Sequence, residues 1–520
     1  MSAPPSACVV ETILEVLARH PGREALIAPD GRRIGAGAVV DSTWRLARTL
    51  REQGVVRGMS VGLLSGSTPE SVQARYAIAL AGARLVSLYE TTDPTVLAGF
   101  LDSTDCALLL VDPAQYGTAR ELLPLLKRTI VQCLAPGGPG GDLRAAAATH
   151  PPTPFPVEAR PEDDWSVVST GGTTGGPKGV RLSHAAYGHM VRQMPAGLGD
   201  PPRLLLPGGT ASSTSAMTDI TLLQGGTVVL QEVFDPAAVL AAVERERATV
   251  VCLQPPHLQR VVDAPELART DVSSLVRILY TGCACPVSLL RRAVGAFGAI
   301  LLGCYGQTEA GAISALLPHE HDAGTLSQDG AVSVGRPLPG VEVSVRDEKG
   351  ASVSTGAEGE IWVRSPGAMS GYWKRDDLDR RVRLPDGWLR TGDLGRLDGR
   401  GHLFVLSRLT DVMFVSGGNG LLRVYPADLE QALAGHPAIA ACAVLGAPGA
   451  GLAEDIHVVV VHAPGHRTDL AQLRTFLTEL RGAPYAPAAL HLLPELPLTA
   501  RGKPDKRALR DLLGLAAAGA

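Results

Sequence analysis

The sequence predicts an α/β fold, in which a large N-terminal domain of two α/β lobes and a β-rich subdomain precedes a small α+β C-terminal domain. Three observations support this prediction. Helical and strand-like patterns alternate in two successive blocks up to residue 304, short strands with turns follow from about residue 331, and a last compact unit begins near residue 407. At roughly 150 residues per domain, 520 residues suffice for about three such units.

The first lobe is expected because helical patterns alternate with short strand-like runs, which is typical of an α/β sheet. The elements expected in it cover, in chain order, 10–19, 25–28, 40–53, 60–65, 69–81 and 105–112. Residues 135–162 are rich in Gly and Pro and have no period, so we interpret them as a surface connection or linker.

The second lobe is expected from apolar runs that recur between helical stretches. The strand-like runs cover 203–207, 227–231, 249–254, 276–281 and 299–304, and the helical stretches include 236–248 and 286–297. Beyond residue 331, segments such as 340–350 and 359–365 predict short strands joined by turns, and therefore a β-rich subdomain.

The final unit combines two helical patterns with three strand-like runs. These elements cover 426–434, 440–446, 456–462, 468–480 and 488–493. A segment of about 100 residues with this content is large enough for a compact α+β domain of its own.

The composition argues against several classes of protein. The 48 Lys and Arg residues nearly balance the 52 Asp and Glu residues, which disfavours nucleic acid or an anionic membrane as a partner. The N-terminal segment lacks the pattern of a secretory signal, and uncharged runs are shorter than the roughly 20 apolar residues of a membrane-spanning helix. We therefore expect a soluble, cytoplasmic protein. Its eight scattered cysteines predict reduced thiols, and Cys283 and Cys285 have no second pair at zinc-like spacing.

The segment 169–179, STGGTTGGPKG, is rich in groups that bind phosphate. Its glycines allow backbone N–H groups to turn inward around an anion, its hydroxyls add donors, and its lysine adds positive charge. It does not match the Walker pattern, which argues against a P-loop NTPase. A flexible linker is the alternative, but the position between a strand-like run and a helical run at 183–193 favours a phosphate loop. The predicted phosphate-binding residues are Ser169, Thr170, Gly171, Gly172, Thr173, Thr174, Gly175 and Lys178.

Three further segments carry groups suited to a nucleotide site. Residues 305–309, YGQTE, combine an aromatic ring for a base, a hydroxyl for a phosphate and a carboxylate for a metal. Asp393, within 388–395, is suited either to accept the hydroxyls of a ribose or to form a hairpin turn. Lys503 lies on a Gly-containing loop of the basic segment 497–507, which in isolation is typical of a solvated tail.

In this order, the four segments resemble the adenylate-forming superfamily, which includes acyl-CoA synthetases, aryl-CoA ligases, free-standing adenylation domains and luciferases. The resemblance extends over essentially the whole chain and also includes 30–32, 54–58, 359–363, 371–373 and 425–430. It implies an enzyme that activates a carboxylic acid with ATP as an acyl-adenylate, releases pyrophosphate and transfers the acyl group to the thiol of coenzyme A.

The resemblance also implies roles for individual residues. The loop 169–179 would close over the β- and γ-phosphates of ATP, and Thr308 would contact the α-phosphate. Glu309 would bind Mg²⁺, and Lys503 would bridge the acid and the α-phosphate, so Lys503, Thr308 and Glu309 are the expected catalytic residues. The residues that match the adenine and ribose contacts are Gly282, Cys283, Ala284, Tyr305, Gly306, Asp393 and Arg408.

The same resemblance implies a division of the chain. Residues 1–407 would form the N-terminal domain with the ATP and acid site, and 408–411 would form a hinge. Residues 412–520 would then be a mobile lid domain that rotates between adenylation and transfer.

The sequence departs from the family pattern at three places. Thr410 occupies a hinge position where an acidic residue or a lysine is common. About four residues, 420–423, are inserted after the predicted acceptor loop, which contains Gly417 and Gly418, and the insertion is either a tolerated surface loop or a sign of another acyl acceptor. The stretch 206–213 lacks the histidine that relatives often place beside the acid. The predicted lining of the acid pocket is Thr210, Ser212, Ser213, Met217, Cys304 and Ala310.

The predicted function is therefore that of an AMP-forming acid–thiol ligase that uses ATP, Mg²⁺ and coenzyme A on a small-molecule carboxylic acid. The alternatives are transfer to the phosphopantetheine thiol of a separate carrier protein, transfer to an amine, and activation of another small oxyanion such as nitrite. A binding protein without turnover is disfavoured because Thr308, Glu309 and Lys503 occur together with Asp393 and Arg408. The sequence leaves open whether the acid is aryl, short aliphatic or fatty.

Overall fold

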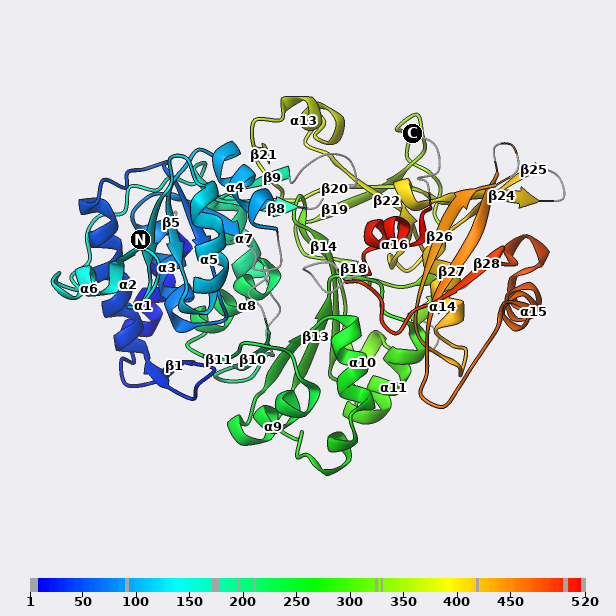
Figure 1. Cartoon of the computed structure of the whole chain (residues 1–520), viewed down its shortest axis with the longest axis horizontal. Coiled ribbons are helices and arrows are strands. Elements are labelled where there is room, and N and C mark those ends of the chain that lie inside the picture. Colours follow the sequence, from blue (N-terminus) through cyan, green and yellow to red (C-terminus); the bar gives the residue numbers. More distant parts are fainter. Residues whose placement is uncertain are drawn as a thin grey trace.

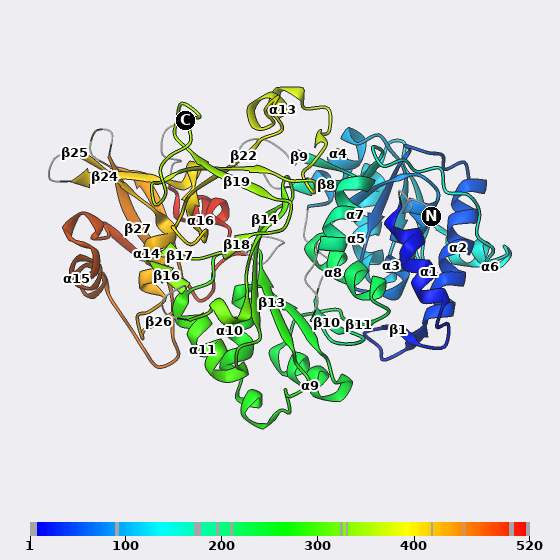
Figure 2. The ribbon, with the colours of Figure 1, turned by 180° about the vertical axis from the view of Figure 1, so that it is seen from behind.

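The structure, a computed structural model, confirms the predicted α/β fold with a large N-terminal and a small C-terminal domain (Figure 1). The first lobe and the C-terminal domain lie at opposite ends of the molecule, and the second lobe lies between them, as the view from behind also shows (Figure 2). The described residues are 8–88, 93–170, 178–193, 197–208, 212–322, 326–328, 331–417, 420–449, 451, 453–498 and 504–515, with the side chains of 212–214, 327, 328 and 420 left out.

The first lobe is built on an eight-stranded sheet. Its strands run parallel from β8 to β7, and two further strands form an antiparallel edge. In sheet order they are β21 (Gly371–Tyr372), β9 (Lys178–Ser183), β8 (Asp164–Thr170), β4 (Arg84–Leu88), β3 (Ser60–Leu64), β5 (Cys106–Val111), β6 (Ile130–Cys133) and β7 (Gly141–Asp142). The helices of this lobe are α2 (Ala36–Glu52), α3 (Pro69–Leu80), α4 (Pro94–Ser103), α5 (Tyr116–Leu122) and α6 (Leu143–Ala148).

The second lobe is built on a nine-stranded sheet. In sheet order its strands are β18 (Arg336–Pro337), β15 (Gly311–Leu316), β14 (Leu301–Gln307), β13 (Arg277–Thr281), β12 (Val250–Leu253), β10 (Arg203–Pro207), β11 (Thr227–Gln231), β1 (Glu24–Ile27) and β2 (Arg33–Gly35). Helices α9 (Pro236–Glu246), α10 (Pro255–Asp263) and α11 (Val287–Phe297) pack on one face of it. Although β1 occurs within the first block of alternation, it pairs in parallel with β11 and thus belongs to the second sheet.

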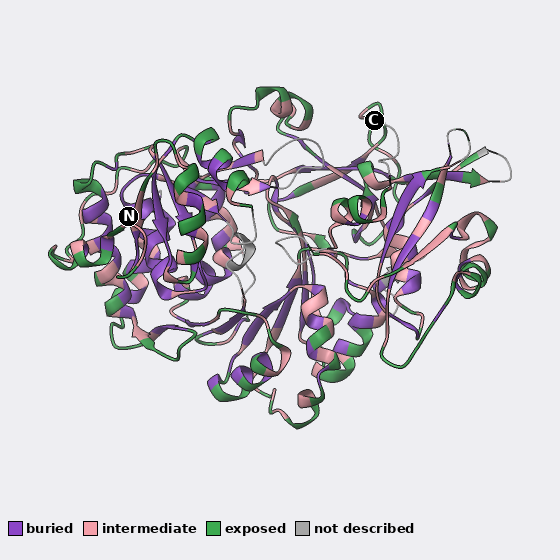
Figure 3. Ribbon diagram, in the orientation of Figure 1, coloured by how far each residue is buried: buried purple, intermediate pink, exposed green. Residues whose placement is uncertain are grey.

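The two sheets share one hydrophobic core. Helices α1 (Val9–Ala18), α3, α7 (His184–Gln193) and α8 (Ser212–Leu223) contribute to it together with residues of both sheets, such as Leu85 and Val228. The buried parts of these helices and strands are visible in Figure 3. Within this core Arg75 of α3 forms an ion pair with Asp219 of α8, with Nη1 and Oδ2 2.7 Å apart, and both side chains are buried. Tyr76 and Tyr187 donate further hydrogen bonds to the same carboxylate, at 2.6 and 2.5 Å.

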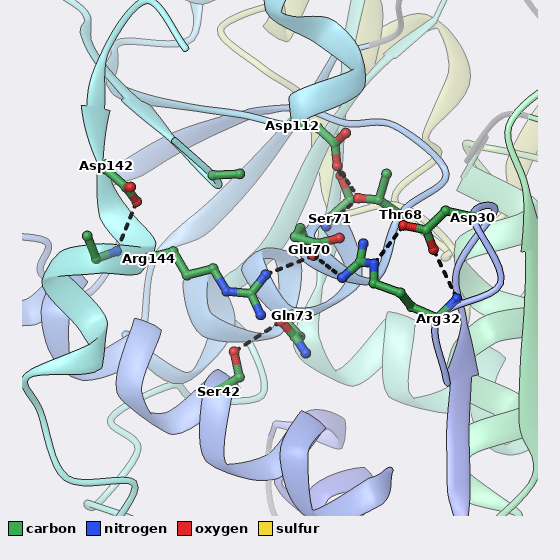
Figure 4. A network of polar contacts seen from close by, with 12 residues as sticks. Asp30, Arg32, Ser42, Thr68, Glu70, Ser71, Gln73, Asp112, Asp142 and Arg144 are labelled. Carbon is green, nitrogen blue, oxygen red and sulfur yellow. Dashed lines mark hydrogen bonds and ion pairs between the residues drawn. The ribbon is translucent and has the colours of Figure 1, made fainter. Parts of the chain in front are cut away.

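A polar network holds the start of α3 in place (Figure 4). Arg32, after β1, and Arg144 of α6 both reach Glu70, at 3.3 and 2.8 Å. The Thr68 side chain caps the start of α3. The hydroxyls of Thr68 and Ser71 both donate to the carboxylate of Asp112, at the end of β5. Burial of Glu70 and Asp112 is therefore compensated by partners from α6, from the start of α3 and from the loop after β1.

The rest of the chain forms the β-rich subdomain and the C-terminal domain. The subdomain contains an antiparallel sheet of β19 (Glu342–Arg346), β20 (Gly359–Arg364), β22 (Leu389–Leu397) and β23 (Leu403–Arg408), the strand pair β16 (Ser327–Gln328) and β17 (Ala331–Val332), and α13 (Asp376–Val382). The C-terminal elements are β24 (Met413–Gly417), β25 (Gly420–Val424), α14 (Pro426–Leu433), β26 (Ile439–Pro448), β27 (Glu454–His462), α15 (Leu470–Arg481), β28 (Ala489–Leu492) and α16 (Lys506–Leu513), around a core of their own. Among the described residues, no helix is both long and apolar enough to cross a membrane.

Candidate active site

The centre of the candidate site is the buried carboxylate of Asp393 on β22. The hydroxyl of Tyr305, on β14, donates to its Oδ2 atom at 2.5 Å, and Nε of Arg408, on β23, lies 2.9 Å from its Oδ1 atom. Pairing of β22 with β23 sets Asp393 opposite Arg408. The structure therefore brings together three residues predicted to bind the adenosine part of ATP, from two different sheets.

Two residues that the sequence interpretation missed complete this cluster. Nε2 of Gln307 donates to Asp393 at 2.5 Å and to the carbonyl of Thr391 at 3.0 Å. The hydroxyl of Thr391 accepts the backbone N–H of Asp393 at 3.0 Å, while its carbonyl accepts Nη1 of Arg408 at 3.0 Å. Because side chains alternate along a strand, Gln307 lies on the same face of β14 as Tyr305, and this period of two could have identified it.

Its surroundings keep the Tyr305 hydroxyl protonated, so that it acts as a hydrogen-bond donor. Burial, and then the neighbouring carboxylate of Asp393, raise the pKa of Tyr305 well above its ordinary value. The hydroxyl therefore stays protonated at neutral pH and can donate to Asp393. The negative charge of Asp393 is balanced by Arg408, which suits a site that orients a nucleoside.

The predicted phosphate loop begins and ends on paired strands. Ser169 and Thr170 end β8, Lys178 begins β9, and the two strands pair antiparallel with Thr170 opposite Lys178. The helical run predicted at 183–193 is α7, which begins at His184, and β9 lies between it and the loop. The predicted residues Gly171, Gly172, Thr173, Thr174 and Gly175 lie outside the described residues.

Glu309 and Lys178 both lie near the side chain of Tyr372, on β21. The Tyr372 hydroxyl donates to Oε1 of Glu309 at 3.1 Å, and Nζ of Lys178 lies 5.9 Å from the centre of its ring. The backbone carbonyl of Glu309 accepts the N–H of Met369 at 2.8 Å. The predicted metal ligand is thus held by a tyrosine that sequence reasoning did not select. Thr308 precedes it in the turn between β14 and β15.

The predicted adenine contacts follow β13 at its carboxyl end. Gly282 adopts a φ of +101°, a conformation that glycine favours, and Cys283 and Ala284 come directly after it. The Thr281 hydroxyl donates to the carbonyl of Cys304 at 2.9 Å and so joins this end of β13 to β14. A side chain at Gly306 would bring its Cβ within 2.4 Å of a backbone carbonyl, so the chain passes closely there.

The predicted acid pocket is described in part. Cys304 is partly buried on β14, and burial raises the pKa of its thiol to about 12, so it is neutral. Ala310 and Met217 are buried in hydrophobic cores, at 0% and 2% exposure, and Met217 packs within the core shared by the lobes. Ser212 and Ser213 begin α8 without described side chains, and Thr210 lies outside the described residues. The composition of this pocket stays a prediction.

Lys503 and Gly418 also lie outside the described residues, but their surroundings are described. The loop that contains Lys503 is closed at its base by a bridge between Leu498 and Pro504 and by a 2.8 Å hydrogen bond from Asp505 N–H to the carbonyl of Pro497. Asp505 then caps α16. The described residues on both sides of the predicted lysine are therefore anchored to each other, and the role of Lys503 stays a prediction.

The residues interpreted as an insertion form a strand. Residues 420–424 are β25, which pairs with β24 so that Gly417 is opposite Gly420. The segment therefore extends a two-stranded hairpin, which we call the β24–β25 hairpin. Phe414 and Leu421 are exposed on it, at 42% and 51%. Thr410 lies in a short helical turn and its hydroxyl donates to Asp411 at 3.2 Å.

The cluster around Asp393, the glycine-rich segment that follows β8 and the small C-terminal domain are the features expected of an adenylate-forming enzyme. The chain belongs to the family described as AMP-binding enzyme, which matches residues 14–373, and the AMP-binding enzyme C-terminal domain matches 428–503.

Comparison with known proteins agrees with this assignment. The chain is 32% identical to the medium/long-chain-fatty-acid–CoA ligase FadD8 of Mycobacterium tuberculosis, over 96% of this chain and 89% of that protein. It is 32% identical to a feruloyl-CoA synthase of Amycolatopsis sp, over 95% of each. The solved structure of the amide bond synthetase McbA from Marinactinospora thermotolerans is 35% identical, covers 97% of this chain and 99% of its own, and has a TM-score of 0.88. The prediction of an ATP-dependent, AMP-forming acid–thiol ligase of the acyl-CoA synthetase type is confirmed.

Proposed function

We propose that the protein converts apolar monocarboxylic acids, aryl or fatty, into acyl-adenylates and transfers the acyl group to coenzyme A. The observation that carries this proposal is the neutral character of the predicted acid pocket. The residues predicted to line it whose side chains are described, Met217, Cys304 and Ala310, are uncharged. A second charge on the acid would have no partner among them, and an unpaired buried charge is costly.

The relatives support an apolar acid. Proteins 32% identical to this chain are named for medium- and long-chain fatty acids, for the feruloyl group and for indoleacetate. These acids share one carboxylate and a large apolar body. A pocket of small neutral side chains is compatible with either an aromatic or an aliphatic body, so the proposal covers both.

Magnesium fits the donor set of the proposed site. Mg²⁺ is commonly held by one or two protein oxygens together with phosphate oxygens of the substrate. Glu309 supplies a carboxylate that a tyrosine orients, and Thr308 beside it supplies a hydroxyl. When bound there, Mg²⁺ would neutralise negative charge on the phosphates of ATP.

In the proposed first step, an oxygen of the acid attacks the α-phosphorus of ATP. A new oxygen–phosphorus bond forms, the bond to the bridging oxygen breaks, and pyrophosphate leaves. Lys503 supplies positive charge where negative charge develops, and the cluster around Asp393 orients the nucleoside. In the second step the thiolate of coenzyme A attacks the acyl carbon, and AMP leaves with the electron pair of the broken carbon–oxygen bond.

The two steps require different surroundings of one site. In the proposal, residues 408–411 form the hinge and 412–520 form a lid that rotates between the steps. In the arrangement described here, the Tyr425 hydroxyl of the lid donates to Glu358 of the N-terminal domain at 2.6 Å, and Gln259 donates to the carbonyl of Ala440 at 3.0 Å. Rotation would break both bonds.

The proposed acid class is tested by pyrophosphate release with ATP and Mg²⁺ over a panel of acids. Aryl propenoic acids, indoleacetate and medium-chain fatty acids are expected to support release. A short dicarboxylate is expected to react about 100-fold more slowly or worse, because burying an unpaired carboxylate costs several kcal/mol. Equal rates for the dicarboxylate would contradict the proposed class, and no release with any acid would contradict the proposed function itself.

A second candidate function is amide formation, in which an amine attacks the acyl carbon. Two observations favour it: the 35% identity to a solved amide bond synthetase, and the β24–β25 hairpin in the segment that the family resemblance assigns to the second step. A relative that is 29% identical is named as a fatty acid–acyl-carrier-protein ligase, so a carrier-protein thiol is a third acceptor to be compared.

The role of the β24–β25 hairpin in the second step is tested by Leu421→Ser. Leu421 is 51% exposed in this arrangement, so the substitution is expected to leave adenylation and thermal stability unchanged. If the hairpin enters the site after rotation, loss of its apolar contact would slow acyl transfer about tenfold. The matched control is Leu480→Ser, on α15 of the same domain and 49% exposed. Single-turnover transfer from preformed adenylate to coenzyme A or to an amine separates the acceptors, and unchanged transfer by Leu421→Ser would exclude the hairpin from the second step.

A further inference from the structure

Residues 365–373, which we call the strap, connect the two lobes beside the phosphate loop. On one side the N–H groups of Ser370 and Trp373 donate to the carbonyls of Arg181 and Gly179, at 2.8 and 2.7 Å. On the other side the N–H of Met369 donates to the carbonyl of Glu309 at 2.8 Å. The strap therefore contacts both the strand that leaves the phosphate loop and the turn that carries the proposed metal ligand.

The local sequence fixes the strap closely. Gly371 has a φ of +145°, and a Cβ atom there would lie 2.4 Å from Oδ2 of Asp379, so the position requires glycine. The other oxygen of Asp379 accepts the N–H of Tyr372 at 2.8 Å. Gly311 similarly has a φ of +71° and allows the carbonyl of Gly367 to approach. These contacts fix the conformation of the backbone next to Tyr372 and the position of the strap beside Gly311.

Tyr372 is a buried residue of the strap whose side chain lies near both Glu309 and Lys178. It is 7% exposed and packs in a core with Val180 and Ala310. Its hydroxyl donates to Oε1 of Glu309 at 3.1 Å, and the centre of its ring lies 5.9 Å from Nζ of Lys178. A phenylalanine would fill the apolar part of the site equally well, so the hydroxyl must be explained by its polar contact.

We propose that Tyr372 is a positioning residue for the nucleotide step. Its hydroxyl orients the carboxylate of Glu309, and its ring supports the side chain of Lys178. The metal contact from one lobe and the phosphate contact from the other thereby keep a fixed relative position. The inference rests on the proposed role of Glu309 as a magnesium ligand. Groups that orient a metal ligand commonly affect metal affinity by 10- to 100-fold, because an oriented ligand loses less freedom on binding.

The test is Tyr372→Phe, which keeps the ring and removes only the hydroxyl. Binding of Mn²⁺ to the complex of the full-length protein with a non-hydrolysable ATP analogue is measured by electron paramagnetic resonance. We expect about tenfold weaker Mn²⁺ binding, together with unchanged binding of the analogue in the absence of metal. The matched control is Tyr116→Phe, because the Tyr116 hydroxyl donates to the carbonyl of Ala135, away from the site. This control is expected to bind Mn²⁺ like the wild type.

A double-variant cycle separates positioning from general stability. If Tyr372 acts through Glu309, adding Tyr372→Phe to Glu309→Gln should weaken Mn²⁺ binding no further than Glu309→Gln alone. Wild-type Mn²⁺ affinity in Tyr372→Phe, or effects that add fully in the double variant, would overturn the inference. The proposed function is judged separately, from acid-dependent pyrophosphate release by the wild-type protein, so failure of one does not imply failure of the other.

Discussion

Lys503→Ala is expected to reduce acid-dependent pyrophosphate release by about two to three orders of magnitude, the usual cost of removing a charge-stabilising group from a transition state. The loop that carries Lys503 is closed by the Leu498–Pro504 bridge and by the Asp505 cap of α16. These anchors do not involve the lysine side chain, so the thermal stability of the variant should be unchanged. Single-turnover assays with ATP, Mg²⁺ and an accepted acid measure the effect.

The control for this prediction is Arg507→Ala, which removes an exposed cation a few residues away on the same segment. It should keep wild-type pyrophosphate release. Lys503→Ala should also still transfer the acyl group from a synthetic acyl-adenylate to coenzyme A, because the lysine is proposed to act in the first step. Equal loss of both steps, or equal loss in the two variants, would contradict the assigned role.

Asp393→Asn is expected to weaken ATP binding about 10- to 100-fold, since hydrogen bonds to a charged group contribute roughly 1.5–3 kcal/mol. The amide removes the charge that faces Arg408, and its NH₂ group would oppose the donors of Tyr305 or Gln307. Titration of the protein with a non-hydrolysable ATP analogue measures the loss of affinity.

The matched control for Asp393→Asn is Asp347→Asn in the same subdomain. Oδ1 of Asp347 accepts the N–H groups of Lys349 and Ala351 in an exposed turn, and an asparagine oxygen can accept the same bonds. This variant should bind the analogue normally. Unchanged affinity in Asp393→Asn would remove Asp393 from the nucleoside site.

The fold and the order of the site segments could be predicted because they depend on local pattern. The alternation of helical and strand-like runs identified both lobes, and the segments at 169–179 and 305–309 predicted a phosphate loop and an adenine contact. Asp393 and Arg408 were identified by family resemblance, and the structure brings them together with Tyr305.

Other features depend on contacts between distant segments and were not predictable from one sequence. In the sequence, β1 lies among the elements of the first block, but its backbone pairs with β11 of the second sheet. The segment after the phosphate loop pairs as β9 because β8 offers it an open edge. Gln307 gains its role from Asp393, 86 residues away, and Tyr372 from Glu309, 63 residues away. Thr391 gains its role from Gln307, 84 residues away, and from Arg408 on the adjoining strand. The strand formed by 420–424 likewise depends on its pairing with β24 rather than on the composition of the segment.

The core shared by the two lobes limits how this chain can be recombined with its relatives. Exchanging the first lobe alone would set two unrelated surfaces against each other and would separate Arg75 from Asp219, leaving a charge buried without its counterpart. The C-terminal domain has its own core, which includes Met413, Leu429 and Val458. A crossover between 408 and 412 would keep both cores whole. Chimeras made at that junction are therefore the natural way to interchange acid and acceptor preferences, whereas the two lobes must be inherited together.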